Sequence, residues 1–369
     1  EAQEQLERLI GVVQELRELS FITTPKVVVV TRDEFTQRVA SNVQEAAEDF
    51  PADEALFKLL GLLPPEADYD AIITELYSET AAGFYDFDEE EIVVPATEEG
   101  FTVIQQETLV HELVHALTDQ HFDVQTPYQQ MLDEERFDEA SGYLALIEGD
   151  ASLVEFFWLQ NLSRSDLRSL LEEVVTIDLS ALRAAPPFLQ DSLVFPYDSG
   201  LAFVQDLFES GGWQAVDDAY VSFPGFPPST EQVMTPDDYG LDLPIVVELP
   251  RIDLDGYELA TESVWGEASF RIMLRQGLGD DVAAPAADGW GGDRYYQWFD
   301  GENAALLIGY VGDTMVELDE LEAALLDYAF NVVPEEDFVW VEEVGGVLYF
   351  IAADDPEVGI QIRTAVGAG

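Results

Sequence analysis

The sequence predicts an α+β protein in which a small N-terminal mixed sheet precedes a long helical part. Apolar residues recur at helical spacing in most long segments, a few short apolar runs have the length of strands, and an acidic turn joins two of these runs. The length of 369 residues allows two or three domains. We expect an N-terminal α/β part at 1–100, a helical part at 101–260 and a largely helical C-terminal part with short strands at 261–369.

The N-terminal part alternates helical and extended patterns. Residues 1–20 carry apolar side chains on one helical face, and the valine run at 26–30 predicts a buried strand. Residues 33–62 predict helices interrupted at Pro51, and 71–95 predict strands. The last of these strands form a hairpin at 84–94, whose edge suits an extended peptide.

The helical part begins with a strong start signal. Thr102 and Gln105 form a capping-box pattern just ahead of an apolar run, which predicts a helix at 103–120. The same reasoning predicts the later elements: helices at 138–161, 164–184, 198–221, 263–276 and 317–330, strands at 244–249, 304–311 and 347–352, a Pro-rich loop at 223–230 and a Gly-rich turn at 289–295.

The composition excludes several classes of protein. The chain has 76 Asp and Glu, 15 Lys and Arg and a net charge of −61, yet 47% of its residues are hydrophobic, so it has a core and is not disordered. The negative field repels phosphate backbones, which excludes nucleic acid as a partner. No apolar stretch is long enough to span a membrane. The absence of cysteine excludes disulfides and thiolate chemistry.

The acidity also indicates the environment. Lys26 and Lys58 are the only lysines, and the other cations are arginines. An acidic, lysine-poor surface resembles proteins of salt-loving microbes, above all haloarchaea, because molar salt screens self-repulsion. A cation-buffering protein is the rival interpretation, but no D-x-D-x-D-G calcium loop is present. We expect a halophilic protein, with an extracytoplasmic or cell-surface location preferred to the cytoplasm and the oligomeric state left open.

The three histidines lie together at 111–121, and the first two belong to an H-E-x-x-H pattern. On a helix, His115 lies about 40° around the axis and about 6 Å along it from His111, so both imidazoles can reach one zinc ion. Glu112 lies about 100° around, beside such an ion, where it can accept a proton from a metal-bound water. The alternative is a pair of structural histidines in an acid-rich protein.

A third zinc ligand is predicted from the next helix. Glu148 is a single carboxylate on an apolar helix face, and a divalent cation would offset the cost of its burial. Other candidates are Glu135, Glu139, Glu155 and His121. For His121, the metzincin spacing would require a bend at Thr118, which is β-branched and resists it.

The segment at 111–119, H-E-L-V-H-A-L-T-D, resembles the corresponding segment of thermolysin and so of the gluzincin branch of zinc metallopeptidases. The chain is similar to poorly characterised bacterial and archaeal zinc-protease-like proteins through further segments, at 111–122, 145–151, 228–232 and 289–295. The resemblance implies a zincin-like fold with His111, His115 and Glu148 as ligands and Glu112 as general base. It also implies a histidine near 234–236, where this chain has Met-Thr-Pro.

The function expected is a zinc-dependent metallopeptidase that hydrolyses peptide or protein substrates. Arg294, Tyr295 and Tyr296 follow the Gly-rich turn and are candidates to stabilise the oxyanion, with Tyr143 as an alternative. Asp119 is a candidate to orient His115. Three other functions remain open: an inactive zinc-binding or surface protein, a zinc amidohydrolase of non-peptide substrates, and a metal-free structural protein.

Overall fold

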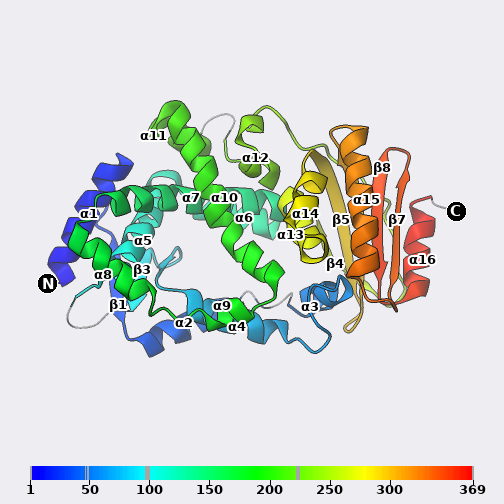
Figure 1. Cartoon of the computed structure of the whole chain (residues 1–369), viewed down its shortest axis with the longest axis horizontal. Coiled ribbons are helices and arrows are strands. Elements are labelled where there is room, and N and C mark those ends of the chain that lie inside the picture. The colour runs from blue at the N-terminus through cyan, green and yellow to red at the C-terminus, as the bar shows by residue number, and fades with distance from the viewer. Residues whose placement is uncertain (1, 46, 48–49, 96–99, 222–224, 368–369) are drawn as a thin grey trace.

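The computed structural model describes residues 2–45, 47, 50–95, 100–221 and 225–367. Positions 46 and 48–49 of the predicted helical stretch at 33–62, and the first two residues of the predicted Pro-rich loop at 223–230, lie outside these ranges. The described chain is mixed α+β, as the sequence predicts, and forms an elongated molecule with a small sheet near one end and a larger sheet at the other (Figure 1).

The N-terminal elements surround a small mixed sheet with the strand order β1-β3-β2. β1 pairs with β3 in parallel, β2 pairs with β3 antiparallel, and β2 lies at an edge. The hairpin prediction is thus confirmed, but the strand predicted from residue 71 is wrong, because Asp68 caps a helix there. The elements are α1 (Ala2–Arg17), β1 (Lys26–Val30), α2 (Arg32–Glu45), α3 (Phe50–Leu59), α4 (Tyr69–Thr80), β2 (Phe84–Asp86) and β3 (Glu91–Pro95).

The middle of the chain is helical. The capping box of Thr102 and Gln105 is formed and starts the predicted helix, and the next long helix is also present. The elements are α5 (Val103–Phe122), α6 (Gln125–Asp133), α7 (Phe137–Gln160), α8 (Arg164–Val174), α9 (Ser180–Ala184), α10 (Pro187–Gly211), α11 (Trp213–Val221), α12 (Thr230–Met234) and a short 3-10 turn, η2 (Pro236–Asp238).

Small residues let α7 and α10 cross closely. A Cβ atom on Gly149 would lie 2.1 Å from the carbonyl oxygen of Gly200, and one on Gly200 would lie 2.1 Å from that of Ala145. Since α10 is the neighbour at this crossing, the small residues bring α10 up to the helix that carries Glu148.

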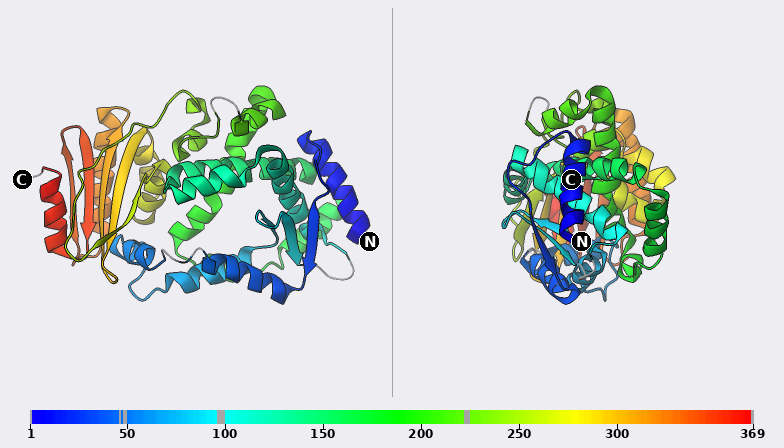
Figure 2. Two further views of the ribbon diagram at one scale, coloured as in Figure 1. Left: turned by 180° about the vertical axis from the view of Figure 1, so that it is seen from behind. Right: turned by 90° about the vertical axis from the view of Figure 1, so that its left-hand side faces the viewer.

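The C-terminal part is not largely helical, which corrects the prediction. It contains a five-stranded antiparallel sheet in the order β4-β5-β6-β8-β7, with helices on both faces (Figure 2). The predicted Gly-rich turn is the start of a central strand, and no strand forms at 244–249. The elements are β4 (Glu258–Ser263), α13 (Glu267–Leu278), α14 (Asp280–Ala287), β5 (Trp290–Phe299), β6 (Ala304–Gly312), α15 (Met315–Asn331), β7 (Phe338–Val344), β8 (Val347–Ala353) and α16 (Pro356–Ala365).

Both faces of this sheet are covered. Along β6, Leu306 and Ile308 join a core with α13, α14 and α15, while Leu307 points to the other face and packs with α16. Strands buried on both faces lose the alternation of apolar and polar residues, which is why the sequence pattern did not reveal the sheet. Leu59 of α3 also belongs to this core. A helix of the N-terminal part, α3, thus packs on the C-terminal sheet.

No helix in the described part of the chain combines the length and apolar character that crossing a bilayer requires.

A buried carboxylate fastens the small sheet and gives a prediction for pH. Glu91 of β3 is 6% exposed and accepts bonds from Lys26 of β1 and, at 2.8 Å, from Arg38 of α2. Hydrogen bonding to Lys26, followed by that to Arg38, holds the pKa of Glu91 below its usual range. The stabilisation is therefore complete above the unfolded pKa and is lost as the pH falls through the lower folded pKa.

Glu91→Gln is expected to lower the free energy of unfolding by about 1 kcal/mol near pH 7, because both partners are partly exposed and the pair is screened by water. The difference from the unsubstituted protein should shrink as the pH is lowered towards 4. Urea unfolding at constant molar KCl, followed by circular dichroism, measures it. An equal difference at both pH values would contradict the linkage.

Candidate metal centre

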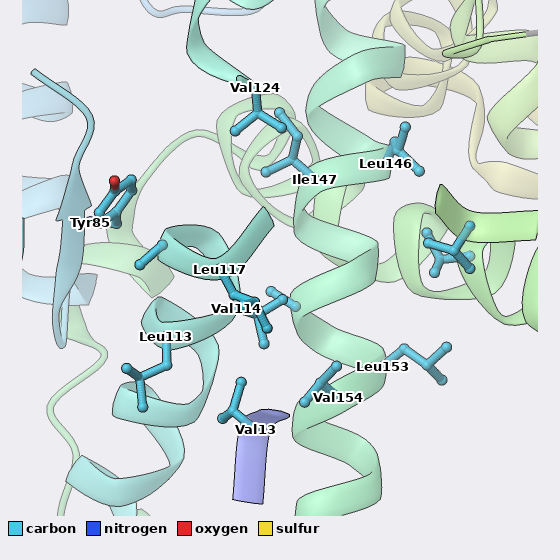
Figure 3. Close-up of a cluster of buried hydrophobic side chains, with 14 of the residues drawn as sticks. Val13, Tyr85, Leu113, Val114, Leu117, Val124, Leu146, Ile147, Leu153 and Val154 are labelled. Carbon is cyan, nitrogen blue, oxygen red and sulfur yellow. The ribbon is translucent and has the colours of Figure 1, made fainter. Parts of the chain in front are cut away.

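The predicted ligand helices, α5 and α7, pack side by side through apolar residues. Figure 3 shows Leu113, Val114 and Leu117 of α5 beside Val154 and Ile147 of α7. These three α5 side chains are fully buried, as the apolar stripe of the sequence predicts. His111 and His115 lie outside this apolar stripe and face Glu148 of α7.

Three potential ligands converge between the helices. The Nε2 atom of His111 lies 3.0 Å from Oε2 of Glu148, and Nε2 of His115 lies 3.5 Å from the same oxygen. The two imidazole rings are 4.7 Å apart at an interplanar angle of 83°. Ligand atoms of the three residues all lie within 4.8 Å of one another. The structure therefore brings together the set that sequence reasoning selected.

The separations suit a tetrahedral ion with nitrogen and oxygen ligands. Donor atoms at about 2.0–2.1 Å from zinc are about 3.3–3.5 Å apart, close to the two distances observed here. The side chains of His111, His115 and Glu148 are 12%, 8% and 13% exposed, so the three donors are shielded but reachable. One carboxylate and two neutral imidazoles carry a single negative charge, which a divalent cation would more than offset.

Contacts within this centre raise the pKa of His111 and lower the pKa of Glu148. Burial would lower the pKa of His111, but hydrogen bonds to Glu148 and Glu155 raise it well above its usual range. Burial would raise the pKa of Glu148, but the charge of His115 and the hydrogen bond to His111 bring it well below its usual range. The carboxylate is therefore ionised and available as a ligand.

Glu155 orients His111 from the other side of its ring. Its Oε2 atom lies 3.2 Å from Nδ1 of His111, one face of α7 supplying both this contact and Glu148. Glu155 was a candidate ligand from the sequence, but it faces the opposite ring nitrogen. A proton on Nδ1 leaves the Nε2 lone pair free for a metal. Glu107 of α5 lies next to Glu155. Burial, followed by the charge of Glu155, raises the pKa of Glu107 to about 7.

Glu112 lies beside the three candidate ligands and is not one of the converging set. Its side chain is 7% exposed, and burial raises its pKa, against the opposing effect of the charges of His115 and His111. A hydrogen bond from the backbone of Tyr85 on the edge strand β2 also reaches this carboxylate. A carboxylate held next to a metal site, with a raised pKa, is suited to proton transfer.

Tyr197 is the functional candidate that sequence reasoning missed. Its ring lies 6.0 Å from that of His111, and burial, together with the charges of Glu148 and Glu112, raises the pKa of its hydroxyl well above the usual range. The hydroxyl therefore remains a hydrogen-bond donor. The only sequence signal is Pro196, which stands within α10 and marks an irregular helix next to this tyrosine.

The predicted oxyanion candidates do not lie at this centre. Arg294, Tyr295 and Tyr296 belong to β5 in the C-terminal sheet, far from α5 (Figure 1). Arg294 pairs with Glu262 at 2.6 Å, and the buried Tyr295 packs edge-on against Trp265 at 5.3 Å. These residues were predicted from a Gly-rich turn that is in fact a strand.

Tyr143 is also displaced from the site. It is buried in an aromatic cluster, where its ring lies 5.1 Å from Phe226 and 6.4 Å from Tyr220.

The alternative ligands have other partners. The Nε2 atom of His121 lies 2.8 Å from the carbonyl oxygen of Ser20, because α5 continues unbroken past Thr118. Glu139 pairs with Arg136 at 2.6 Å at the start of α7. The side chain of Glu135 accepts a bond from the backbone N–H of Glu262.

The predicted contact between Asp119 and His115 does not form. The Tyr85 hydroxyl donates to Asp119 at 3.0 Å, and Nδ1 of His115 is buried without a hydrogen-bond partner among the described residues. Asp119 therefore fastens β2 to α5, since Tyr85 belongs to that strand.

The remaining sequence segments build a joint between the helical part and the C-terminal sheet. Asp138 of α7 accepts bonds from the backbone and, at 2.6 Å, the hydroxyl of Thr230. Asp293 of β5 accepts bonds from the backbone N–H groups of Trp265 and Gly266 and from the indole of Trp290. The segments at 228–232 and 289–295 therefore stabilise the contact between the helical part and the C-terminal sheet. They supply no ligand to the candidate metal centre.

Comparison with known proteins bears on the C-terminal part alone. A family described as "Domain of unknown function (DUF8575)" matches residues 255–357, which cover the five-stranded sheet. A search of curated proteins and one of solved structures each found no match. The similarity to this family covers residues 255–357 and does not include α5 or α7.

Proposed function

We propose that the protein is a zinc-dependent metallopeptidase with a zincin-like, gluzincin-type centre, adapted to high salt. The observation that carries the proposal is the convergence of His111, His115 and Glu148 from two packed helices, with the buried Glu112 beside them. Two imidazoles and one carboxylate form a common ligand set of catalytic zinc. The strongly acidic composition supports a halophilic setting, and we prefer an extracytoplasmic or cell-surface location.

The residues present fit a zinc ion. His111 and His115 would hold it through Nε2 and Glu148 through a carboxylate oxygen, with Glu155 fixing the ring of His111. When bound, zinc supplies a Lewis acid that polarises a carbonyl group and lowers the pKa of water.

The chain's own side chains would carry the proton and the developing charge. Glu112 accepts the proton of the attacking water and passes it to the leaving amine. The Tyr197 hydroxyl, whose ring lies 6.0 Å from that of His111, donates a hydrogen bond to the carbonyl oxygen as that oxygen becomes negative. Tyr197 takes the role that sequence reasoning gave to residues of β5.

The surroundings favour an extended peptide with apolar side chains. The edge strand β2 contacts Glu112 through Tyr85, so a peptide added to that edge would pass close to the general base. A cavity of about 340 Å³ also lies between α3, α4, α7, α10 and α13, and mostly apolar residues line it. Ser141, on its wall, precedes Glu148 on α7 by about two helical turns, or roughly 10 Å.

Zinc binding tests the centre directly. Glu148→Ala is expected to weaken zinc binding at least about 100-fold, since the only anionic ligand is removed. The dissociation constant is measured by competition with a chromophoric chelator in molar KCl. Glu139→Ala, on the same helix, is the matched control and should bind zinc as the unsubstituted protein does.

Equal zinc affinity in the two variants would contradict the ligand assignment. The reaction itself is tested with a peptide library at molar salt: cleavage that depends on zinc supports the peptidase. Zinc binding without cleavage of any peptide would favour a zinc-binding or surface protein, and cleavage confined to non-peptide amides would favour an amidohydrolase.

A further inference from the structure

We propose that Glu231, Asp242 and Asp313 bind a calcium ion that fastens α12 to the turn between β6 and α15. This site is separate from the candidate zinc centre and does not rest on the proposed function. Carboxylate oxygens of the three residues all lie within 4.8 Å of one another, and they come from α12, the loop after η2 and the turn that follows β6. α12 packs against α13, and Asp313 follows directly after β6 of the larger sheet.

The first argument is a buried carboxylate without a partner. Glu231 is 4% exposed, and no hydrogen bond or ion pair from a described residue reaches its carboxylate. The charged groups that act on it are all acidic, with Glu267 the strongest and Asp313 and Asp242 next. An ionised carboxylate in such a place is costly unless a cation is bound.

The second argument comes from α13. Glu267 is 3% exposed, and its Oε2 atom is buried without a hydrogen-bond partner among the described residues. Arg271, the cation that acts on Glu267, is already bound to Asp280 at 3.0 Å. Two buried acids thus act on each other while the nearest arginine is held elsewhere.

The pKa values of Glu231 and Glu267 are both raised, as expected for buried acids that lie close together. Burial, followed by the charge of Glu267, raises the pKa of Glu231 to about 9, and burial, followed by the charge of Asp288, raises the pKa of Glu267 to about 8. Both shifts have the same physical origin, which is the burial of neighbouring acids that lack a bound cation.

Backbone contacts hold the three acids in place. Next to Glu231, the buried Gln232 accepts a bond from the backbone N–H of Gly240 at 3.0 Å and donates to the carbonyl oxygen of Asp242. The loop that carries Asp242 is therefore tied to α12.

Asp313 is held by the segment that begins β5. Its backbone N–H donates to the carbonyl oxygen of Gly289 at 3.1 Å, and a Cβ atom on Gly291 would come within 3.1 Å of its Oδ1 atom. A glycine thus leaves space next to this carboxylate. Two sequence segments that the zinc centre does not use, at 228–232 and 289–295, meet at this place.

The ligand chemistry favours calcium. The set offers only oxygen, which hard cations prefer, whereas zinc prefers imidazole and thiolate. Two oxygens on opposite sides of one calcium ion are up to about 5 Å apart, which accommodates the spread observed here, whereas magnesium requires a tighter octahedron. Asp313 is exposed, so water can complete the shell.

Calcium binding is to be measured on the full chain, stripped of metals, reloaded with zinc and kept in molar KCl. Calorimetric titration with calcium chloride should show saturable binding, and the melting temperature should rise by several degrees. Asp313→Asn, at the exposed ligand, should weaken calcium binding at least tenfold. Glu320→Gln, on the exposed side of α15, is the matched control and should leave it unchanged.

Variants of the two sites distinguish the proposed calcium site from the candidate zinc centre. Glu148→Ala should lose zinc and keep calcium, and magnesium should bind more weakly than calcium. The proposal is overturned if millimolar calcium changes neither the heat signal nor the melting temperature, which would mean that the acids remain protonated. It is also overturned if Asp313→Asn binds calcium as tightly as Glu320→Gln.

Discussion

Glu112→Gln is expected to reduce peptide cleavage about 10²–10⁴-fold while leaving zinc binding intact. Glutamine has the same shape as glutamate but cannot accept the proton of the attacking water. Glu112 is adjacent in sequence to the proposed ligand His111 but does not belong to the converging set, so the variant keeps His111, His115 and Glu148. The loss should therefore be in kcat, with little change in the zinc dissociation constant.

The reduction caused by Glu112→Gln is measured from initial rates of cleavage of the best peptide of the library, in molar KCl with saturating zinc. Glu320→Gln makes the same chemical change on an exposed helix face and should retain full activity. If Glu112→Gln cleaved as fast as this control, another group would have to be the base. If it lost zinc instead, Glu112 would be a ligand, contrary to its position beside the set.

The candidate centre was accessible from the sequence because its signals are local. The H-E-x-x-H spacing fixes the relation of His111 to His115 within one helix, and Glu148 stood out as a lone acid on an apolar helix face. Tyr197 had no such signal, since only the crossing of α7 and α10 brings it to the site. Tertiary packing, and not sequence spacing, decides which tyrosine approaches the candidate centre.

The incorrect predictions of secondary structure also have physical causes. The glycines at 289–292 predict a turn, but β5 begins there. In the structure Asp293 is buried and satisfied by the backbone of Trp265 and Gly266, which a sequence pattern cannot show. The pattern from residue 71 predicts a strand, but the side chain of Asp68 caps a helix there, and the helix α4 forms instead.

The segment after Glu148 contains a buried ion pair that joins α1 to α7. Arg17 is fully buried, and its Nε and Nη2 atoms bind the two oxygens of Asp150 at 2.7 and 3.0 Å. Asp217 of α11 accepts a further bond at 2.7 Å, and the guanidinium lies 4.3 Å from the ring centre of Trp213. One arginine thus connects three helices, two residues away from a proposed metal ligand.

Arg17→Met is expected to lower the free energy of unfolding by about 3–5 kcal/mol, because it leaves the carboxylate of Asp150 buried without its cation. Urea unfolding in molar KCl measures the loss, and Arg168→Met, at an exposed arginine of α8, should change it by less than about 0.5 kcal/mol. The double variant Arg17→Met, Asp150→Leu removes both charges and should regain part of the loss. If the double variant were instead as unstable as the sum of its single changes, the cost would lie in packing rather than in the uncompensated charge.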